Sequence, residues 1–545
     1  MGSWLLEFGV LRRIIAEFIF SGNYFRKIAI KDLAILQTCD LAAIHRYHPF
    51  LLLHRIIPLS PSMRGIKGEG LSQRCPLPCL AANLQVSPKI KRYFWVTLFN
   101  LHFMLNMAIF FAMRPVYIIS GGITKFAKAH PEKDFRLMVK EAFDYAMNDV
   151  PNLTKDIIDG SICSYFSDHF TRQLKAGAMV QDYLGLCPKP SKRIEGGGAT
   201  GGLCFQAAWE AVASGRMEVC VALGFETMSR VNTWKGNEFI AHASDTNFDY
   251  PVGGFYTGYY AMMVQRHMYE FGTTVEQMAM VSVKNHQNAL YNPYSQSPMD
   301  LTIKDVRSSA MVSTPLTMLD ICQMSDGAAV AIVASENMAE KLCSKPVKIT
   351  GIGCGTDAMR MADRPHGKVL LLPHESAKDY KGIKYPGVHS FRGGRMAAKL
   401  AYEMAGIKNP REELDFIELH DAYTSSEIQT YEDLGLCKYG EGGKFVEAGY
   451  PFLSNIDYGL KFKKGNAKLK GKKIPVNPSG GLLACGHPVG ATGLMQAVFA
   501  LWQLQGSIKK HLGKDAIQVK NAGRGLIHSH AGTGTYITAT VMERG

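Results

Sequence analysis

Asn477–Gly493 reads Asn-Pro-Ser-Gly-Gly-Leu-Leu-Ala-Cys-Gly-His-Pro-Val-Gly-Ala-Thr-Gly, and an apolar run that predicts a helix follows it at Leu494–Leu504. Its two prolines and five glycines indicate tight turns. The helix N-terminus that follows offers free N–H groups and the positive end of a helix dipole. A histidine held in such a loop is able to move a proton on a substrate. The stretch therefore predicts His487 as a catalytic residue, although a lone Gly-His-Pro more often only joins a strand to a helix.

The composition is that of a large globular protein with two or more domains: 545 residues, 47% hydrophobic and 20% charged. The net charge of +14 suits nucleic acid, a membrane surface or a pyrophosphate-bearing cofactor. No basic–aromatic motif appears, so nucleic-acid binding is not expected. The 12 cysteines form no CxxC pair. This pattern favours reduced thiols in the cytoplasm, and no metal site is expected.

Residues 1–112 differ from the rest of the chain, because they mix apolar runs with basic pairs and show no clean alternation of strands and helices. Tyr93–Met113 has no charged residue and is about long enough to span a bilayer. Three interpretations are open: a membrane anchor, a targeting segment, or upstream sequence joined to a gene that starts at Met107 or Met113. The last is favoured, because a regular domain begins at Arg114.

From Pro115 the sequence alternates buried strands with helices, which indicates an α/β fold. Predicted strands and helices include Pro115–Gly122, Phe135–Met147, Ile157–Tyr165, Leu203–Ser214 and Glu218–Gly224. The pattern then restarts, since Pro346–Gly353 echoes Pro115–Gly122 and a glycine turn plus helix occurs in both parts. This duplication predicts two halves, residues 113–345 and 346–545, with an insertion at about 229–308 that covers the site.

Two further stretches carry histidines beside predicted strands. His420 follows the strand Leu414–Leu419, and His528–Thr535 is a glycine turn before the strand Tyr536–Met542. Because ligands bind at strand ends in α/β sheets, both are site candidates, although each alone is more often a plain turn.

A glycine pattern leaves one alternative open. Gly196-x-Gly198-x-x-Gly201 fits the dinucleotide-binding pattern, which alone is a weak signal. Residues 189–194 before it make a poor strand, and Glu218 is a doubtful ribose ligand. Hydride transfer is therefore a minor alternative.

The motif set, in this order, resembles the thiolase family, and within it the branch of sterol-carrier-protein-x and archaeal acetoacetyl-CoA thiolases. Asn477–Gly493 matches the family's Gly-His-Pro motif, His420-Asp-Ala-Tyr resembles its His-Asp-Cys/Ala-Phe motif, and Ser325-Asp-Gly-Ala matches another family turn. The resemblance covers Arg114 to Gly545. It implies an α/β, thiolase-like duplicated αβαβα five-layered fold with a loop-domain insertion.

The resemblance also implies acyl transfer between CoA thioesters. In the family, a cysteine at a helix N-terminus is acylated, the histidine equivalent to His487 activates it, and the one equivalent to His420 holds the thioester oxygen. By analogy, Gly532 belongs to the oxyanion region, and Asn477 and Ser479 contact substrate. Coenzyme A is expected as a substrate, with no bound cofactor. A homodimer or homotetramer is expected, together with a small zinc-ribbon/OB-fold partner protein.

The chain departs from the family pattern where the nucleophile belongs. The family reads Glu-x-x-Cys-Ala-Ser/Thr-Gly-Gly, whereas Gly198 stands here in place of the cysteine. The second family cysteine is absent from both usual places, which hold Ala422 and His530. Because loss of a nucleophile removes several orders of magnitude of rate, the usual acyl-enzyme route is doubtful.

Two other cysteines are candidates to replace the missing nucleophile. Cys204, six residues after Gly198, lies about 240° round the helix and is expected in the core. Cys485, two residues before His487, is the plausible substitute thiol, although a packed small residue is an equally good interpretation. The chain is thus either an acyltransferase that cleaves or condenses 3-oxoacyl-CoA or acetoacetyl-CoA, through Cys485 or by direct transfer, or a degenerate homologue that binds acyl-CoA and serves as a partner subunit.

Overall fold

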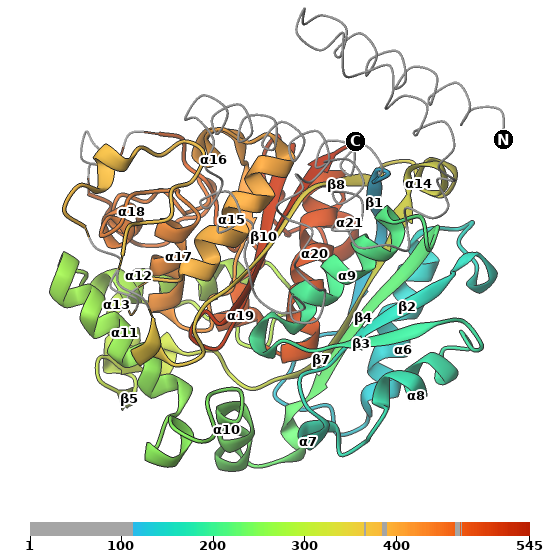
Figure 1. Cartoon of the computed structure of the whole chain (residues 1–545), viewed down its shortest axis with the longest axis horizontal. Coiled ribbons are helices and arrows are strands. Elements are labelled where there is room, and N and C mark those ends of the chain that lie inside the picture. Colours follow the sequence, from blue (N-terminus) through green and yellow to red (C-terminus); the bar gives the residue numbers. More distant parts are fainter. Residues whose placement is uncertain (1–112, 365–366, 384–387, 389, 464–468, 470) are drawn as a thin grey trace, which may run out of the picture. The chain divides into compact units, whose positions relative to one another are not determined.

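The computed structural model describes residues 113–545 except 365–366, 384–387, 389, 464–468 and 470 (Figure 1). The predicted extension 1–112, with most of the candidate span Tyr93–Met113, lies outside the described residues. Among the helices that are described, none combines the length and apolarity that crossing a membrane requires.

One mixed sheet of nine strands runs through the described part, in the order β3-β2-β4-β7-β1-β8-β11-β10-β9. Each half of the chain supplies one contiguous part of it. The first half gives β1 Val116–Ile123, β2 Gly160–Ser164, β3 Ser191–Ile194, β4 Val219–Thr227 and β7 Asp326–Ser335. The second half gives β8 Val347–Thr356, β9 Phe416–Glu418, β10 Arg524–Ala531 and β11 Tyr536–Arg544. The two parts join where β1 pairs with β8, with Tyr117 opposite Lys348.

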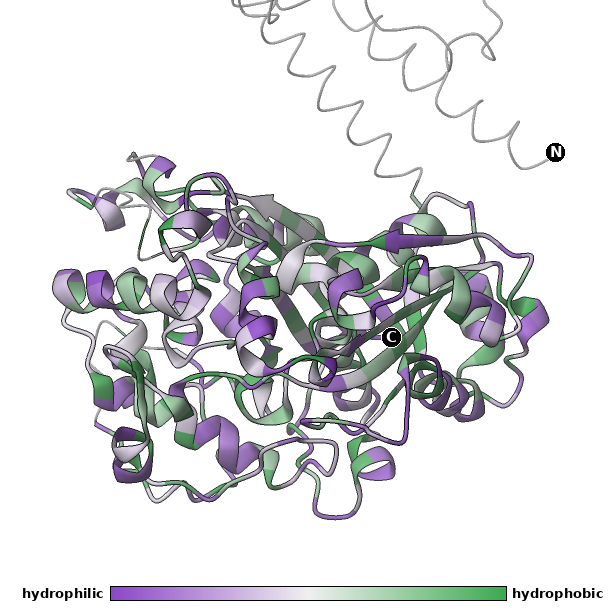
Figure 2. Ribbon diagram, turned by 90° about the horizontal axis from the view of Figure 1, so that it is seen from below, coloured by the Kyte–Doolittle hydropathy of each residue, from purple (hydrophilic) through white to green (hydrophobic). Residues whose placement is uncertain are grey.

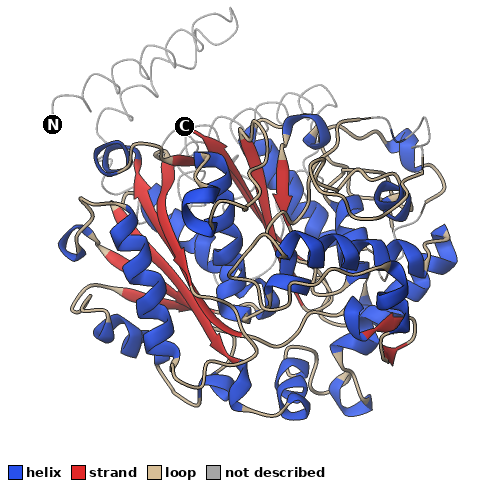
Figure 3. Ribbon diagram, turned by 180° about the vertical axis from the view of Figure 1, so that it is seen from behind, coloured by secondary structure: helices blue, strands red, loops and turns tan. Residues whose placement is uncertain are grey.

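Helices cover both faces of the sheet (Figure 3). On one side α6 (Phe135–Asp149) and α8 (Ala176–Tyr183) pack on the first-half strands, and on the other α15 (Arg392–Ala405) packs on β8 and β11. The helices α9 (Thr200–Ala213) and α20 (Val489–Gln505) pack against each other and against strands from both halves of the sheet. This layering of duplicated halves confirms the predicted thiolase-like α/β fold.

Hydrophobic sequence explains which helices lie inside. Every residue of α20 from Val489 to Leu504 is buried, as expected for a helix that is apolar all round. The outer helix α6 instead buries one face only, which includes Met138, Ala142 and Ala146. Figure 2 shows hydrophobic residues running along the central strands and helices, and mixed polarity on the outer ones.

The N-terminal ends of α9 and α20 meet without intervening side chains. A Cβ on Gly493 would lie 2.1 Å from the backbone nitrogen of Gly202, which excludes any larger residue. The glycine-rich turns that precede the two helices are therefore neighbours.

The predicted insertion is helical. It contains α10 (Thr233–Ala241), α11 (Tyr256–Phe271), α12 (Val275–Ala289) and α13 (Ile303–Ser308), and a small sheet of β5 (Met311–Ser313) and β6 (Leu316–Thr317) follows. Helix α12 packs on α17 (Thr424–Asp433), α18 (Gly442–Glu447) and α19 (Gly481–Cys485). The remaining short helices are α7 (Asp168–Thr171), α14 (Glu336–Leu342), α16 (Pro410–Glu413) and α21 (Ile508–Leu512).

Three local predictions were wrong. Ser191–Ile194 is a strand despite its polar sequence, because it pairs with β2 at an edge of the sheet where side chains reach solvent. His528–Ala531 continues β10, so only residues 532–535 form the turn. The Gly-His-Pro loop contains the helix α19, whose first turn is stabilised by the Asp421 carboxylate; Leu482 N–H donates to it at 2.6 Å.

Candidate active site

The Gly-His-Pro loop fixes both the position and the tautomer of His487. Its backbone N–H donates to Ser325 Oγ at 2.9 Å, so a second predicted motif touches the loop. Its Nδ1 lies 2.7 Å from Thr492 Oγ1, and the Thr492 hydroxyl donates its hydrogen to Pro488 O at 2.9 Å. Thr492 can therefore only accept from Nδ1–H, which leaves the lone pair on Nε2. Burial lowers the pKa of His487 to about 4, so the ring is a neutral base at pH 7.

His420 follows β9 and lies between two other imidazoles. Its ring centroid is 4.9 Å from that of His487 and 4.2 Å from that of His530. Burial, and then the neighbouring histidines, hold the pKa of His420 well below its usual range. Within the described residues no group of three His, Cys, Asp or Glu side chains is arranged to hold a metal ion. Because the pKa values of His420, His487 and His530 all lie below the usual range, the cluster is a set of packed, neutral rings.

Gly198 borders this cluster. It lies in the 3₁₀ turn Gly197–Ala199 that leads into α9. A Cβ at Gly198 would lie 3.2 Å from His420 Cε1 and 2.5 Å from the backbone oxygen of His530. The structure thus brings Gly198, His420 and His487 together, as the sequence predicts, and adds His530.

Gly532 lies beside the same cluster. It begins the turn after β10 with a φ of 55°. Its carbonyl accepts from Tyr260 Oη at 2.6 Å, and the same hydroxyl contacts His530 Nε2 at 2.6 Å. Gly532 therefore reaches the site through Tyr260, a residue of α11.

Asn477 makes contacts that fasten the loop. Its Oδ1 accepts from Leu419 N–H at 2.7 Å, and its Nδ2 donates to Glu427 Oε2 at 3.2 Å. These bonds tie the residue with a φ of 53° to the end of β9 and to α17. In the structure the Asn477 side chain therefore holds protein groups together.

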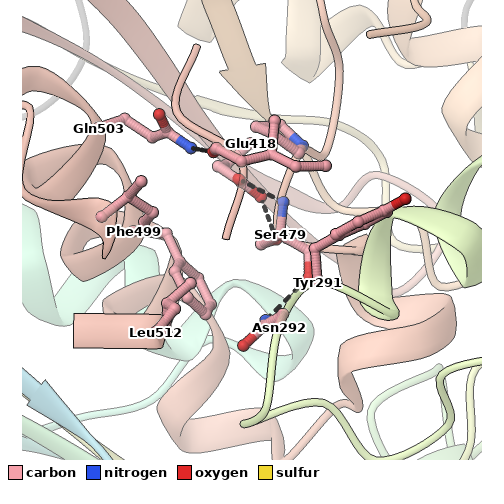
Figure 4. Close-up of a pocket in the computed structure, with 10 residues that line it drawn as sticks. Tyr291, Asn292, Glu418, Ser479, Phe499, Gln503 and Leu512 are labelled. Carbon is pink, nitrogen blue, oxygen red and sulfur yellow. Dashed lines mark hydrogen bonds between the residues drawn. The ribbon is translucent and has the colours of Figure 1, made fainter. Parts of the chain in front are cut away.

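Ser479 points to a separate small cavity. Its hydroxyl donates to Glu418 Oε2 at 2.5 Å and its N–H to Glu418 Oε1 at 3.1 Å, as Figure 4 shows. The cavity beside them has a volume of about 10 Å³, which is room for one water. Burial raises the pKa of Glu418 to about 7. Ser479, like Asn477, fastens the loop to β9, and these contacts do not favour a substrate-binding role.

The two candidate thiols, Cys485 and Cys204, contact residues outside the histidine cluster. Cys485 ends α19, and Asn292 Nδ2 donates to its Sγ at 3.7 Å while also bonding Ser479 O at 2.9 Å. Burial raises the pKa of the Cys485 thiol to about 12, so it carries no thiolate at neutral pH. Neither finding favours Cys485 as a nucleophile. Cys204 is confirmed as a core thiol: it is fully buried, and its Sγ donates to Ile162 O at 3.3 Å.

Sequence reasoning missed a buried ionic network behind the site. Lys284 Nζ lies 2.8 Å from Glu427 Oε1, and both side chains are fully buried. Lys284 also donates to Val476 O at 2.8 Å, and Asn285 Nδ2 donates to Asp421 Oδ2 at 2.7 Å. A lone lysine in a helix usually reaches solvent, so no sequence signal marks Lys284. Asp421 could have been found, because it directly follows His420.

Glu226, at the end of β4, is a second missed residue. Its Oε2 accepts from Phe166 N–H at 2.8 Å and from Gly490 N–H at 3.0 Å, in the first turn of α20. Burial raises its pKa to about 8. A carboxyl that keeps its proton thus anchors the start of the helix after His487.

The glycine turn of the dinucleotide alternative packs against protein. A Cβ on Gly201 would lie 2.6 Å from Gly493 N, so α20 takes the space that a pyrophosphate needs. Glu218 bonds Arg114 and Ser335 instead of facing a ribose. Both observations argue against hydride transfer.

Comparison with known proteins gives the same family from both halves of the chain. Residues 116–337 match "Thiolase, N-terminal domain" and residues 384–544 match "Thiolase C-terminal domain-like". Acetyl-CoA acetyltransferase of Methanothermobacter thermautotrophicus is 35% identical over 79% of this chain and 100% of its own length. Bovine sterol carrier protein 2 is 31% identical over 79% of this chain and 72% of its own.

A solved structure described as "Ltp2-ChsH2(DUF35) aldolase" superposes with a TM-score of 0.60, at 23% identity, over 79% of this chain and 98% of the other. This likeness supports the fold. The matches to both thiolase domains and to relatives more than 30% identical show that the chain belongs to the thiolase family.

Proposed function

We propose that this chain binds an acyl-CoA thioester and makes or breaks the C2–C3 bond of its acyl group by acid–base catalysis, without an acyl-cysteine intermediate. Coenzyme A is the substrate that thiolases use. The observation that carries the proposal is the surrounding of Gly198, a position without a side chain that borders a cluster of neutral imidazoles through His420.

Cleavage by direct transfer uses groups that lie at the site. The lone pair of His487 Nε2 takes the proton of the CoA thiol, and the thiolate attacks the C3 carbonyl of a 3-oxoacyl-CoA. The C2–C3 bond then breaks, its electron pair forms the enolate of the departing acyl-CoA, and C2 regains a proton. The N-terminus of α9 and His420 stabilise the negative oxygen. Condensation is the same sequence in reverse.

Aldol cleavage is the second candidate, because it needs a base and no nucleophile. A base takes the 3-hydroxyl proton of a 3-hydroxyacyl-CoA, the C2–C3 bond breaks, and a carbonyl compound and an acyl-CoA enolate separate. The absence of a side chain at Gly198 favours this reaction as much as direct transfer, and the fold neighbour described as an aldolase is in keeping with it.

The test offers purified protein three substrates and follows products by mass spectrometry. Acetoacetyl-CoA or a longer 3-oxoacyl-CoA with CoA tests thiolysis, a 3-hydroxyacyl-CoA tests aldol cleavage, and calorimetry measures binding. We expect turnover that His487→Asn lowers about 100-fold or more, while Cys485→Ala keeps it. Loss of turnover in Cys485→Ala would reinstate the acyl-enzyme route. Binding without turnover of any substrate would favour a partner subunit.

We also propose that the chain works as a homo-oligomer with a small partner of the zinc-ribbon/OB-fold type. The family resemblance and the DUF35 protein in the fold neighbour's description support this. Co-expression with such a protein should yield a stable complex in size-exclusion chromatography. A protein that elutes as a monomer and recovers no partner would refute it.

A further inference from the structure

The connection from β8 to α15 bonds the turn of residues 532–535 that follows β10. The connection begins at Asp357, whose backbone N–H donates to the carbonyl oxygen of Thr535 at 3.3 Å. Further along, one terminal nitrogen of Arg364 donates to the carbonyl oxygen of Thr533 and, at 2.7 Å, to the Thr533 hydroxyl oxygen. Residues 338–383 lie between the two stretches that match thiolase domains, so these matches do not extend to Arg364. The turn is therefore held by a segment outside the matched domains.

Arg364 places a buried positive charge beside the site. Only 4% of its surface is exposed, although a guanidinium is seldom buried, because it loses water that hydrogen bonds must replace. Burial raises the pKa of Tyr260 well above its ordinary value, and the charge of Arg364 acts against that rise. Arg364 therefore lies near enough to act on Tyr260, which still keeps its proton at neutral pH. An uncharged side chain would pack as well here, so the charge and the rigid donors of Arg364 indicate a further role.

The turn fixes the tautomer of His530. The Tyr260 hydroxyl lies 2.6 Å from the carbonyl oxygen of Gly532 and 2.6 Å from His530 Nε2. A carbonyl only accepts, so the single hydroxyl hydrogen of Tyr260 goes to Gly532. His530 must then donate from Nε2–H, because two lone pairs at this distance would repel.

Displacement of the turn would release this tautomer. Without Gly532 as acceptor, the Tyr260 hydroxyl can turn its hydrogen toward Nε2, and the ring hydrogen of His530 then moves to Nδ1. His530 packs on His420 at 4.2 Å between ring centroids, and His420 stabilises the negative oxygen in the proposed reaction. The position of the His530 hydrogen therefore changes the electrostatic potential at that oxygen.

We infer that Arg364 is a positioning residue: it holds the turn of residues 532–535 in place and, through Gly532 and Tyr260, keeps the hydrogen of His530 on Nε2. The inference rests on the proposed function only in taking the histidine cluster as the place of reaction. Arg364 acts through the turn and needs no contact with the substrate. Its loss therefore changes the rate of the reaction rather than the binding of acyl-CoA.

The first test compares turnover of the cleaved substrate among variants. Arg364→Met keeps the volume and removes the charge and the donors, and we expect kcat to fall about tenfold or more with KM within about twofold of the wild type. Arg364→Lys keeps the charge and should recover part of the rate. Arg360→Met is the matched control, because it makes the same change on the same connection, where the guanidinium lies over the Phe248 ring at 4.4 Å; it should leave kcat unchanged. Should Arg364→Met fail to fold, Thr533→Val removes one acceptor only and should lower kcat about threefold, with recovery in Thr533→Ser.

The second test reads the tautomer without turnover. Protein labelled with 15N-histidine gives NMR signals that distinguish a protonated Nε2 from a bare one, and the His530 signals are those missing from His530→Gln. We expect a protonated Nε2 in the wild type and in Arg360→Met. In Arg364→Met we expect a shift toward a protonated Nδ1.

The outcomes separate the inference from the proposed function. A tautomer shift in Arg364→Met, in a protein that cleaves none of the offered substrates, would support the inference and remove the function. Cleavage at the wild-type rate in Arg364→Met, or a His530 tautomer that this variant leaves unchanged, would overturn the inference alone. A loss that appears only in KM, or that Arg360→Met shares, would overturn it too, because it would indicate a binding role or general destabilisation.

Discussion

Restoring a cysteine at Gly198 should fail to restore a nucleophile. A Cβ there would lie 2.5 Å from the backbone oxygen of His530, whereas favourable contacts between such atoms are about 3.5 Å, so β10 and the turn before α9 must separate by about 1 Å. The obstacle is space rather than conformation, because Gly198 is not among the residues with positive φ. Overpacking of this kind costs about 1–3 kcal/mol, so Gly198→Cys should lower the midpoint of thermal unfolding by a few degrees.

The assay combines thermal unfolding with intact mass after incubation with acetyl-CoA. Gly198→Ala should show most of the same destabilisation, since the Cβ causes the clash. Gly258→Ala is the matched control: nothing lies within 4 Å of its added Cβ, and alanine favours a helix over glycine. No acetyl adduct is expected on Gly198→Cys. A variant as stable as the wild type that gains one acetyl group would refute the packing argument.

Four other predictions concern groups around the site. Thr492→Val removes the acceptor for His487 Nδ1–H, so kcat should fall at least about tenfold with KM unchanged and with recovery in Thr492→Ser. With the pKa of His487 at about 4, kcat/KM should fall as pH drops through about 4 rather than near 6.5. Lys284→Met should destabilise the fold by about 3–5 kcal/mol in urea unfolding, because Glu427 would be left as an unpaired buried charge, and adding Glu427→Gln should recover most of the loss. The pKa of Glu226 rises from 4.5 to about 8 on folding, so its contribution to the free energy of unfolding is complete below about pH 4.5 and is lost as pH rises toward 8. Glu226→Gln should therefore reduce the fall of the free energy of unfolding between these pH values by up to about 1.4 kcal/mol per pH unit. An unchanged dependence of stability on pH in this variant would contradict the assignment.

Sequence reasoning found the parts of the site that local chemistry marks. Glycine and proline density predicted the turn around His487, and apolar length predicted α20, although the helix begins five residues earlier, at Val489. The strand before His420 was found because Leu414–Leu419 is a short run in which four of six residues are apolar. These signals lie within a few residues of one another, which is the range over which backbone preference acts.

What sequence reasoning missed depends on contacts between distant residues. Tyr260 is 270 residues from His530, and nothing around it distinguishes it from the tyrosines beside it on α11. Lys284 reads as a surface residue until α12 is seen packed on three helices. Ser191–Ile194 reads as a loop, because an edge strand takes its stability from its neighbour rather than from its own side chains. Tertiary packing decides each of these cases.

The same packing bears on whether the site has decayed. A site that merely lost its nucleophile would leave the vacated position open to the cysteine it once held. Here the backbone oxygen of His530 would lie 2.5 Å from a Cβ at Gly198, so the close approach of β10 requires a glycine at this position. The histidine on that strand is in turn held in one tautomer by Tyr260 of α11. Three segments far apart in the sequence therefore pack together in an arrangement that fits glycine, and no thiol, at position 198. Such consistency between distant segments is expected of a site that still works.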